Sequence, residues 1–240
     1  MDYPKLTRGV ILSRYKRFLA DIELEDGSVV TAHCPNTGAM TSCWQPGAQV
    51  ELSPSNNPAR KLNWTLERID MGQGWIGVNT NLTNRIICSF IEKGAIPGIS
   101  SIDSITREPR YQAKGFPDSR FDLLLHHTNG SKCYVEIKNA TLLKDNQILF
   151  PDAVSKRGQK HLQLLCHVVD SGHRAIMLYA VNRPEGEIFD VAREIDPEYD
   201  RQLKAAIRTG VEVLAVRIKH SQTGVHYGGL MDLSAQLTVS

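Results

Sequence analysis

The sequence predicts a mixed α/β protein in which a small β-barrel precedes a larger α/β domain. Short apolar runs separated by Gly, Pro, Asn and Ser occupy roughly the first 80 residues, a pattern typical of short strands. From about residue 83, helical patterns alternate with strand patterns, which is typical of a mixed α/β domain. We therefore expect residues 1–82 to form the first domain and residues 83–240 the second.

The first domain opens with a predicted hairpin. Residues 8–24 and 29–33 are apolar-rich runs on either side of Asp26-Gly27, which is a strong turn signal. Further strands are predicted over residues 48–53, 62–70 and 74–79. About five short strands in so short a segment favour a small barrel, of which the five-stranded oligonucleotide-binding (OB) type is one instance.

The second domain alternates helices and strands. We expect helices over residues 83–94, 151–172 and 196–210, a hairpin over residues 120–139, and strands over residues 174–181 and 211–219. Asp152 and Asp196 are the expected N-caps of the second and third helices, and Pro197 fits the first turn. Gly172 and Gly210 follow the predicted helix ends.

Composition excludes several classes of protein. The chain has 240 residues, 41% of them hydrophobic, and no stretch approaches the ~20 apolar residues of a membrane span. Its first residues lack the apolar core of a signal peptide. The five cysteines are odd in number and form no C-x-x-C pair, which favours reduced thiols. We expect a soluble, cytoplasmic protein without a membrane partner, and no pattern sets an oligomeric state.

The charge is uneven along the chain. The formal net charge is only +2, yet residues 107–174 hold 11 lysines and arginines against seven acids, and five of the eight histidines. A basic central region suits a polyanion such as DNA. The alternative is an ordinary solvated surface, because the excess of positive charge is small.

The predicted hairpin at residues 120–139 carries Asp122, Glu136 and Lys138 among apolar residues, with Asn129-Gly130 at its turn. Buried or half-buried ionisable groups are costly unless they are paired or bind a metal. The alternation of side chains places Glu136 and Lys138 on one face of the second strand. These three residues therefore need a partner or a chemical role.

The apolar pattern selects the register of this hairpin. A strict two-residue turn would set Asp122 opposite Ile137 and mix the apolar face with the charged one. A loop one residue longer or shorter pairs Leu123 with Val135 and Asp122 with Glu136. The apolar face then gathers Phe121, Leu123, Leu125, Cys133, Val135 and Ile137.

Two carboxylates directly opposite each other repel, and a divalent cation resolves that repulsion. Lys138 follows at ~7 Å along the same face, within reach of a phosphate or an attacking water. The pattern D-x13-E-x-K is therefore a candidate magnesium site for phosphodiester hydrolysis. The alternative is a surface cluster in which Lys138 merely neutralises Glu136.

Four other residues have open alternatives. Arg157 and His161 lie on or beside the apolar stripe of the predicted helix, where His161 is either a core histidine or a residue at the rim of the site. Asp152 is either the N-cap or a site carboxylate, with the N-cap as the default. Glu108 is either a third carboxylate of the site or a solvent-exposed acid.

Several longer motifs resemble one family. They are "HCPNTGAM" (33–40), "RKL" (60–62), "SRFD" (119–122), "VEIKNATL" (135–142) and "FPDAVSKRGQKHL" (150–162), and together they are similar to the sugar fermentation stimulation protein A family. The resemblance implies an OB-type barrel followed by a PD-(D/E)xK restriction-endonuclease-like α/β domain with a mixed sheet. Departures at Leu123, Ala140 and Ser155-Lys156 remove none of the proposed ligands.

The resemblance also implies site residues and a function. It makes Asp122, Glu136 and Lys138 the catalytic set, with Asp122, Glu136 and Glu108 as ligands of Mg²⁺ or Mn²⁺. The residues expected to contact DNA are Arg120, Lys156, Arg157, Lys160 and His161. The implied function is DNA binding with a divalent-metal nuclease-like site, which would make the protein a candidate Mg²⁺-dependent nuclease. The alternative is a non-catalytic DNA-binding regulator of sugar genes, maltose metabolism among them.

Overall fold

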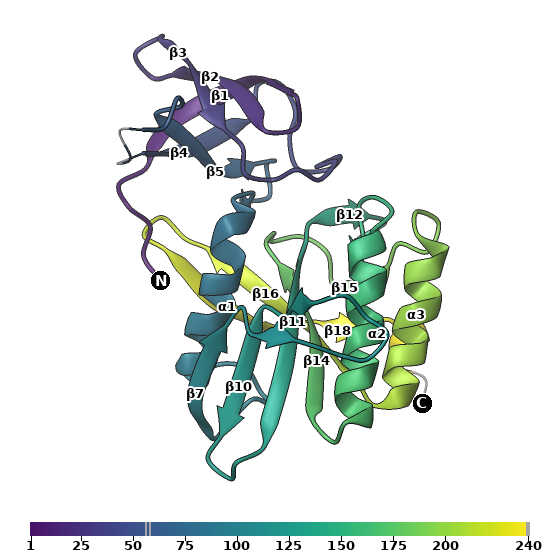
Figure 1. Ribbon diagram of the computed structural model, residues 1–240. Helices are drawn as coiled ribbons and strands as arrows, with labels where there is room; N and C mark the ends of the chain where they lie inside the picture. Colours follow the sequence, from purple (N-terminus) through teal and green to yellow (C-terminus); the bar gives the residue numbers. More distant parts are fainter. Residues whose placement is uncertain (56, 58, 239–240) are drawn as a thin grey trace.

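A barrel and a layered α/β domain make up the protein (Figure 1). The structure is a computed structural model that describes residues 1–55, 57 and 59–238. The barrel strands are β1 (Thr7–Tyr15), β2 (Leu19–Leu24), β3 (Val29–His33), β4 (Gln49–Pro54), β5 (Trp64–Asp70) and β6 (Trp75–Gly77). Their order is β3-β2-β1-β4-β5-β6, and β3 also pairs with β5, so five strands close on themselves. The predicted small barrel is therefore present.

Alternating side chains fill the barrel. Along β1, Gly9 and Ile11 are buried while Arg8 and Leu12 face solvent. Gly9 is needed for close approach, because a Cβ there would stand 2.6 Å from a methyl group of Ile22. The interior consists of Ile11, Ala20, Ile22, Ala32, Cys34, Met40, Cys43, Ala48, Val50, Leu52, Leu66, Ile69, Ile76 and Val78.

Two turns connect the first three strands. The predicted turn at Asp26-Gly27 is present, with Gly27 at a φ of 80°. The sequence pattern also predicts one continuous run over residues 8–24, and that expectation is wrong. Lys16 and Arg17 adopt left-handed conformations, with φ of 49° and 64°, and divide the run into β1 and β2. Neither residue type favours that conformation, so the turn leaves no local signature.

The second domain is built on a mixed six-stranded sheet. Its strands are β7 (Ile102–Arg107), β10 (Leu123–His127), β11 (Lys132–Ala140), β14 (Arg174–Val181), β16 (Glu212–His220) and β17 (Val225–Leu230). The order is β17-β16-β14-β11-β10-β7. Strands β11, β14 and β16 run parallel, and the other pairings are antiparallel. The predicted mixed sheet is confirmed.

Helices cover both faces of this sheet (Figure 1). A short 3-10 helix η1 (Thr80–Leu82) leads from the barrel into α1 (Thr83–Glu92), whose apolar face packs on one side. On the other side lie α2 (Lys156–Asp170) and α3 (Pro197–Thr209). Smaller elements complete the domain: β8 (Arg110–Tyr111), β9 (Ser119–Arg120), β12 (Leu142–Lys144), β13 (Gln147–Phe150), β15 (Ile188–Val191), β18 (Asp232–Leu233) and α4 (Ala235–Thr238). Within residues 1–238, positions 56 and 58 aside, no helix is long and apolar enough to cross a membrane.

The two predicted N-caps have different outcomes. Asp196 caps α3 as predicted, because its side chain accepts a hydrogen bond from the backbone N–H of Tyr199. The N-cap of α2 is Ser155, whose hydroxyl accepts from the N–H of Gly158, and not Asp152. The Asp152 carboxylate instead accepts a hydrogen bond of 2.8 Å from the N–H of Ala39 in the barrel. It therefore joins the two domains.

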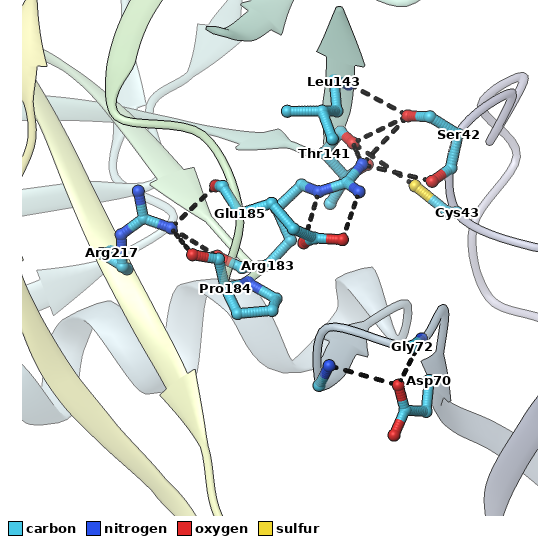
Figure 2. Close-up of polar contacts among 11 residues, drawn as sticks. Ser42, Cys43, Asp70, Gly72, Thr141, Leu143, Arg183, Pro184, Glu185 and Arg217 are labelled. Carbon is cyan, nitrogen blue, oxygen red and sulfur yellow. Dashed lines mark hydrogen bonds and ion pairs between the residues drawn. The ribbon is translucent and has the colours of Figure 1, made fainter. Parts of the chain in front are cut away.

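Arg183 links the second domain to Ser42 of the barrel (Figure 2). Its side chain is 2% exposed. One terminal nitrogen donates to the Thr141 carbonyl at 2.6 Å and to the hydroxyl of Ser42, in the barrel, at 3.0 Å. The other two guanidinium nitrogens bind both carboxylate oxygens of Glu185. Arg217 donates to successive backbone carbonyls of this segment and so fixes the loop that carries Arg183.

Residues 1–3 attach to the second domain before the chain enters the barrel. The backbones of Met1 and Val225 exchange hydrogen bonds, with Met1 N donating at 3.2 Å and Val225 N donating at 2.8 Å. The N–H of Tyr3 donates to the carbonyl of Thr223 at 3.0 Å. The chain returns to the second domain through η1 and α1, so the barrel is joined to that domain on both sides.

Arg68 of the barrel packs against this entering segment. Its guanidinium lies 4.8 Å from the ring centre of Tyr3 and 4.7 Å from that of Trp75. It forms a buried ion pair with Glu51 and donates to the carbonyl of Ser221 in the second domain. A buried charge needs such complete pairing, so Arg68 holds the entering segment, the barrel and the second domain together.

His220 is a neutral member of the same interface. Its Nδ1 is 2.7 Å from the Tyr3 hydroxyl and its Nε2 is 3.0 Å from the Asn182 side-chain oxygen. These partners suit a ring that donates through Nε2 and accepts through Nδ1. Burial, and then the charge of Arg68, lower the pKa of His220 from 6.5 to about 3.

We expect His220 to make the protein less stable in mild acid. The unfolded chain takes up a proton as the pH falls below 6.5, whereas folded His220 does not until about pH 3, so stability is lost across that interval. Lowering the pH from 7.5 to 5.5 should cost about 1.4 kcal/mol through this residue. Urea unfolding at both pH values checks this prediction. Between pH 7.5 and pH 5.5, His220→Gln should lose about 1.4 kcal/mol less stability than the wild type. Equal losses would contradict the lowered pKa of His220.

Candidate metal and phosphodiester site

The β10–β11 hairpin adopts the register that the apolar pattern selects. Leu123 pairs with Val135 and Leu125 pairs with Cys133. The loop is one residue longer than a strict two-residue turn, because the N–H of His127 donates to the carbonyl of Ser131. The side chains of Leu123, Leu125, Cys133, Val135 and Ile137 share one face of the sheet, as predicted, and that face packs against α1.

Phe121 departs from that prediction. It packs on the opposite side of the sheet, with Leu124, Tyr134 and α2. The reason is that β10 begins only at Leu123, and a bend at Asp122 interrupts the alternation of side chains. The same bend places the Asp122 carboxylate at the end of the strand.

Asp122 lies against the neighbouring strand. One carboxylate oxygen accepts a hydrogen bond of 2.7 Å from the backbone N–H of Ile137, and the other accepts one of 2.8 Å from the side chain of Asn84 in α1. These bonds fix the carboxylate beside Glu136. Each oxygen keeps a further lone pair that can bind another group.

Glu136, Lys138 and His161 form a buried cluster on the α2 side of the sheet. The Glu136 side chain is 2% exposed, and its Oε1 contacts both the Lys138 Nζ and the His161 Nδ1. Its Oε2 is buried and has no hydrogen-bond partner among the described residues. The ion pair between Lys138 and Glu136 that the alternative predicts is present, but it is buried and not at the surface. The second oxygen of the same carboxylate is left available.

The two acids have opposite pKa shifts. Burial raises the pKa of the Asp122 carboxyl, and the negative charge of Glu136 raises it further. Burial alone would also raise the pKa of Glu136, but the contacts with His161 and Lys138 outweigh it and hold that pKa below its ordinary value. Glu136 is therefore a firmly ionised carboxylate, and Asp122 is the acid that a bound cation would stabilise most.

The backbone of Glu108 lies next to this site, but its side chain lies at the surface. Its N–H donates to the Asp122 carbonyl at 3.0 Å. Its carboxylate is 70% exposed and lies 3.3 Å from the Arg120 guanidinium. The structure therefore places Asp122, Glu136 and Lys138 together and leaves Glu108 as an exposed partner of Arg120.

A basic hollow of about 490 Å³ adjoins His161. It is lined by Arg110, Asp118, Ser119, Arg120, Arg157, Lys160 and His161. Four of the five residues predicted to contact DNA are thus brought together. The exception is Lys156, which is exposed at the first position of α2 and does not line the hollow. Arg110 and Asn84 belong to the site without having been predicted, because only the fold brings β8 and α1 beside the hairpin.

The donor set fits a hard divalent cation that takes few protein ligands. The unpartnered Glu136 Oε2 and the Asp122 carboxylate supply oxygen ligands from adjacent strands. No three His, Cys, Asp or Glu side chains form a metal-binding group in the part of the chain that the structure describes. Mg²⁺ is commonly held by one or two carboxylates together with waters and substrate phosphates, so two acids suffice for it.

Comparisons with known proteins agree along nearly the whole chain. Residues 12–78 match the family model described as the SfsA N-terminal OB domain, and residues 81–224 match the Sugar fermentation stimulation protein RE domain. A sugar fermentation stimulation protein homolog of Shewanella baltica is 47% identical over 233 residues, covering 96% of this chain and 97% of that protein. A homolog of Geotalea uraniireducens is 46% identical over 223 residues, covering 93% and 94%.

A solved structure gives the same result. SfsA of Pyrococcus furiosus, in complex with Ca²⁺, is 26% identical, with a TM-score of 0.87 over 98% of each chain. The predicted fold, an OB-type barrel followed by a restriction-endonuclease-like α/β domain with a mixed sheet, is confirmed.

Proposed function

The chain belongs to the sugar fermentation stimulation protein A family, and on that basis we propose that it binds DNA and hydrolyses phosphodiester bonds with Mg²⁺ or Mn²⁺. One observation carries the proposal: Asp122 and Glu136 stand together, with Lys138 and His161 on one Glu136 oxygen and the other oxygen unpartnered. A buried carboxylate oxygen without a partner is uncommon, and a bound cation would account for the one on Glu136. The Ca²⁺ bound by the relative from Pyrococcus furiosus also supports a divalent cation.

Each residue of the site has a definite role in this proposal. Asp122 and Glu136 would hold the cation, which when bound supplies polarisation of the phosphate and a more acidic water. Lys138 has three N–H donors and uses one on Glu136, so others remain for a phosphate oxygen that gains charge. His161 touches Glu136 through Nδ1 and keeps that carboxylate in place.

The basic hollow would hold the backbone of the DNA. Arg110, Arg157 and Lys160 line it, and His161 lies between the hollow and Glu136. Positive side chains bind phosphates without regard to sequence, so this surface positions a strand and does not select bases. We therefore expect phosphodiester hydrolysis without strong sequence preference.

Titration with Mn²⁺ in a calorimeter tests the metal site. Wild-type protein should bind the cation and Asp122→Ala should not, because the variant loses one of two carboxylate ligands. Glu108→Ala is the matched control: it removes a nearby acid that is exposed, and it should bind Mn²⁺ as the wild type does. Cleavage assays on single-stranded, double-stranded and branched DNA with Mn²⁺ complete the test, and absence of cleavage on all three would contradict hydrolysis.

The second candidate function is DNA binding without catalysis, as a regulator of sugar-utilisation genes, maltose metabolism among them. It is favoured by the Glu136–Lys138–His161 cluster, which neutralises Glu136 without a metal. In the same experiments it predicts no Mn²⁺ binding by any variant. DNA affinity should then fall steeply as salt is raised, because phosphate contacts release counterions.

A further inference from the structure

We infer that the barrel carries a base-stacking subsite for single-stranded DNA, formed by Phe18 with His33, Arg60 and Lys61, and that a strand bound there runs toward the second domain. The inference rests on the proposed function for its DNA partner. Beyond that function, it specifies that the bound DNA is single-stranded and where on the barrel it binds.

Phe18 is an aromatic side chain displayed to solvent. It is 45% exposed and follows the left-handed turn at Lys16 and Arg17 between β1 and β2. Its backbone is fixed, because its carbonyl accepts a hydrogen bond of 2.8 Å from the N–H of Cys34. The ring is therefore held in place at the surface without being part of the barrel core, which suits stacking on another flat ring.

The surface beside Phe18 is hollow and positively charged. A depression of about 460 Å³ is lined by Phe18, by His33 at the end of β3 and by Arg60 and Lys61 from the β4–β5 connection. Arg60 stands close enough to His33 to add to the lowering of its pKa, whose larger cause is burial. The one acid in this lining, Glu67, is already bonded to Ser53 and Asn79.

This hollow lies at the part of the barrel where OB folds bind nucleic acid. OB barrels bind oligonucleotides across strands 2 and 3 and the loops that connect strands 1 to 2 and 4 to 5. Phe18 lies on the first of those connections, His33 on β3 and Arg60 on the second. An aromatic ring beside cationic side chains at this place is the combination that binds single strands, whose bases are free to stack. Bases inside a duplex cannot reach Phe18.

A second hollow lies between the barrel and the second domain. Asn79 and Asn81 line the first hollow, and Thr80 between them lines a depression of about 290 Å³ between the two domains. Arg17, next to Phe18, and Asn139, next to Lys138, line the same depression. The second hollow therefore lies beside the first along the chain and reaches the end of β11 in the second domain.

Fluorescence anisotropy with an oligothymidylate about 16 nucleotides long, the upper end of OB site sizes, tests this subsite. The assay is done in EDTA, so its result does not depend on the metal site or on cleavage. Phe18→Ala should weaken binding about 5- to 150-fold, the loss of one base stack. Phe18→Trp should restore it, and affinity for a duplex of equal length should change less than about 2-fold.

Val29→Ala is the matched control, because Val29 is an apolar side chain, 60% exposed, at the opposite end of β3 from His33. It should bind the oligonucleotide as the wild type does. The inference is overturned if Phe18→Ala behaves like Val29→Ala, or if it weakens duplex binding as much as single-strand binding. A protein that stacks thymidylate but cleaves nothing would keep this subsite and refute only the proposed hydrolysis.

Discussion

Lys138→Met is expected to lower Mn²⁺-dependent DNA cleavage by about 10²–10³-fold, the usual loss when one donor to a developing negative charge is removed. Metal binding should survive, because Lys138 is not a ligand. Its removal also takes a positive charge away from Asp122 and Glu136, whose pKa values it lowers. The affinity for Mn²⁺ should therefore be equal to or tighter than that of the wild type. Calorimetry and a single-turnover cleavage assay on the same preparation measure both quantities.

Lys132→Met is the matched control for this prediction. Lys132 is an exposed lysine on β11, at the other end of the strand from Lys138. Its replacement should leave metal binding and cleavage unchanged. If Lys138→Met loses metal affinity together with activity, then Lys138 serves to hold Glu136 in place and has no role of its own toward the phosphate.

Arg183→Met is expected to lower the free energy of unfolding by about 3–5 kcal/mol, the usual result when one partner of a buried ion pair is removed. Glu185 would remain in a largely buried position without its cation, and the Thr141 carbonyl and Ser42 hydroxyl would lose their donor. Because Ser42 belongs to the barrel, the variant should also weaken the attachment of the barrel to the second domain.

The positions of the tryptophans make this second effect measurable. Trp44, Trp64 and Trp75 all lie in the barrel part of the chain, so tryptophan fluorescence reports barrel unfolding alone. Circular dichroism reports both domains. During urea unfolding the two signals should coincide in the wild type and separate in Arg183→Met. Arg201→Met, which removes an ion pair whose arginine is 71% exposed, should change stability by less than about 1 kcal/mol and leave the two signals coincident.

The hairpin shows what the sequence was able to predict. Its register follows from the alternation of apolar side chains along two adjacent strands, and that pattern is local. The pairing of Leu123 with Val135 was therefore predictable, whereas the bend at Asp122, just before the paired strand begins, was not. The α3 cap at Asp196 was predictable for the same reason, since the cap and the N–H that it binds are three residues apart.

The errors arise where a distant segment competes for a local group. Asp152 was the expected N-cap of α2, but the barrel loop at Ala39 binds its carboxylate and Ser155 caps the helix. Glu108 stays a predicted ligand, with its exposed carboxylate 3.3 Å from the Arg120 guanidinium. No pattern within either segment reveals these partners. Likewise the basic hollow needs β8 and β9 beside α2, which only the folded chain provides.

The attachment of the barrel on both of its sides determines how it can move. The entering segment at residues 1–3 and the departing segment at η1 are both fixed to the second domain, so the barrel cannot rotate freely as it would on a single linker. The bonds of Ala39 to Asp152, Ser42 to Arg183 and Arg68 to Ser221 also oppose tilting of the barrel. The distance from Phe18 to Lys138 is then nearly constant, and a strand that reached both places would be cut at a set number of nucleotides from the stacked base. The lengths of the cleavage products would then be set by the distance between Phe18 and Lys138.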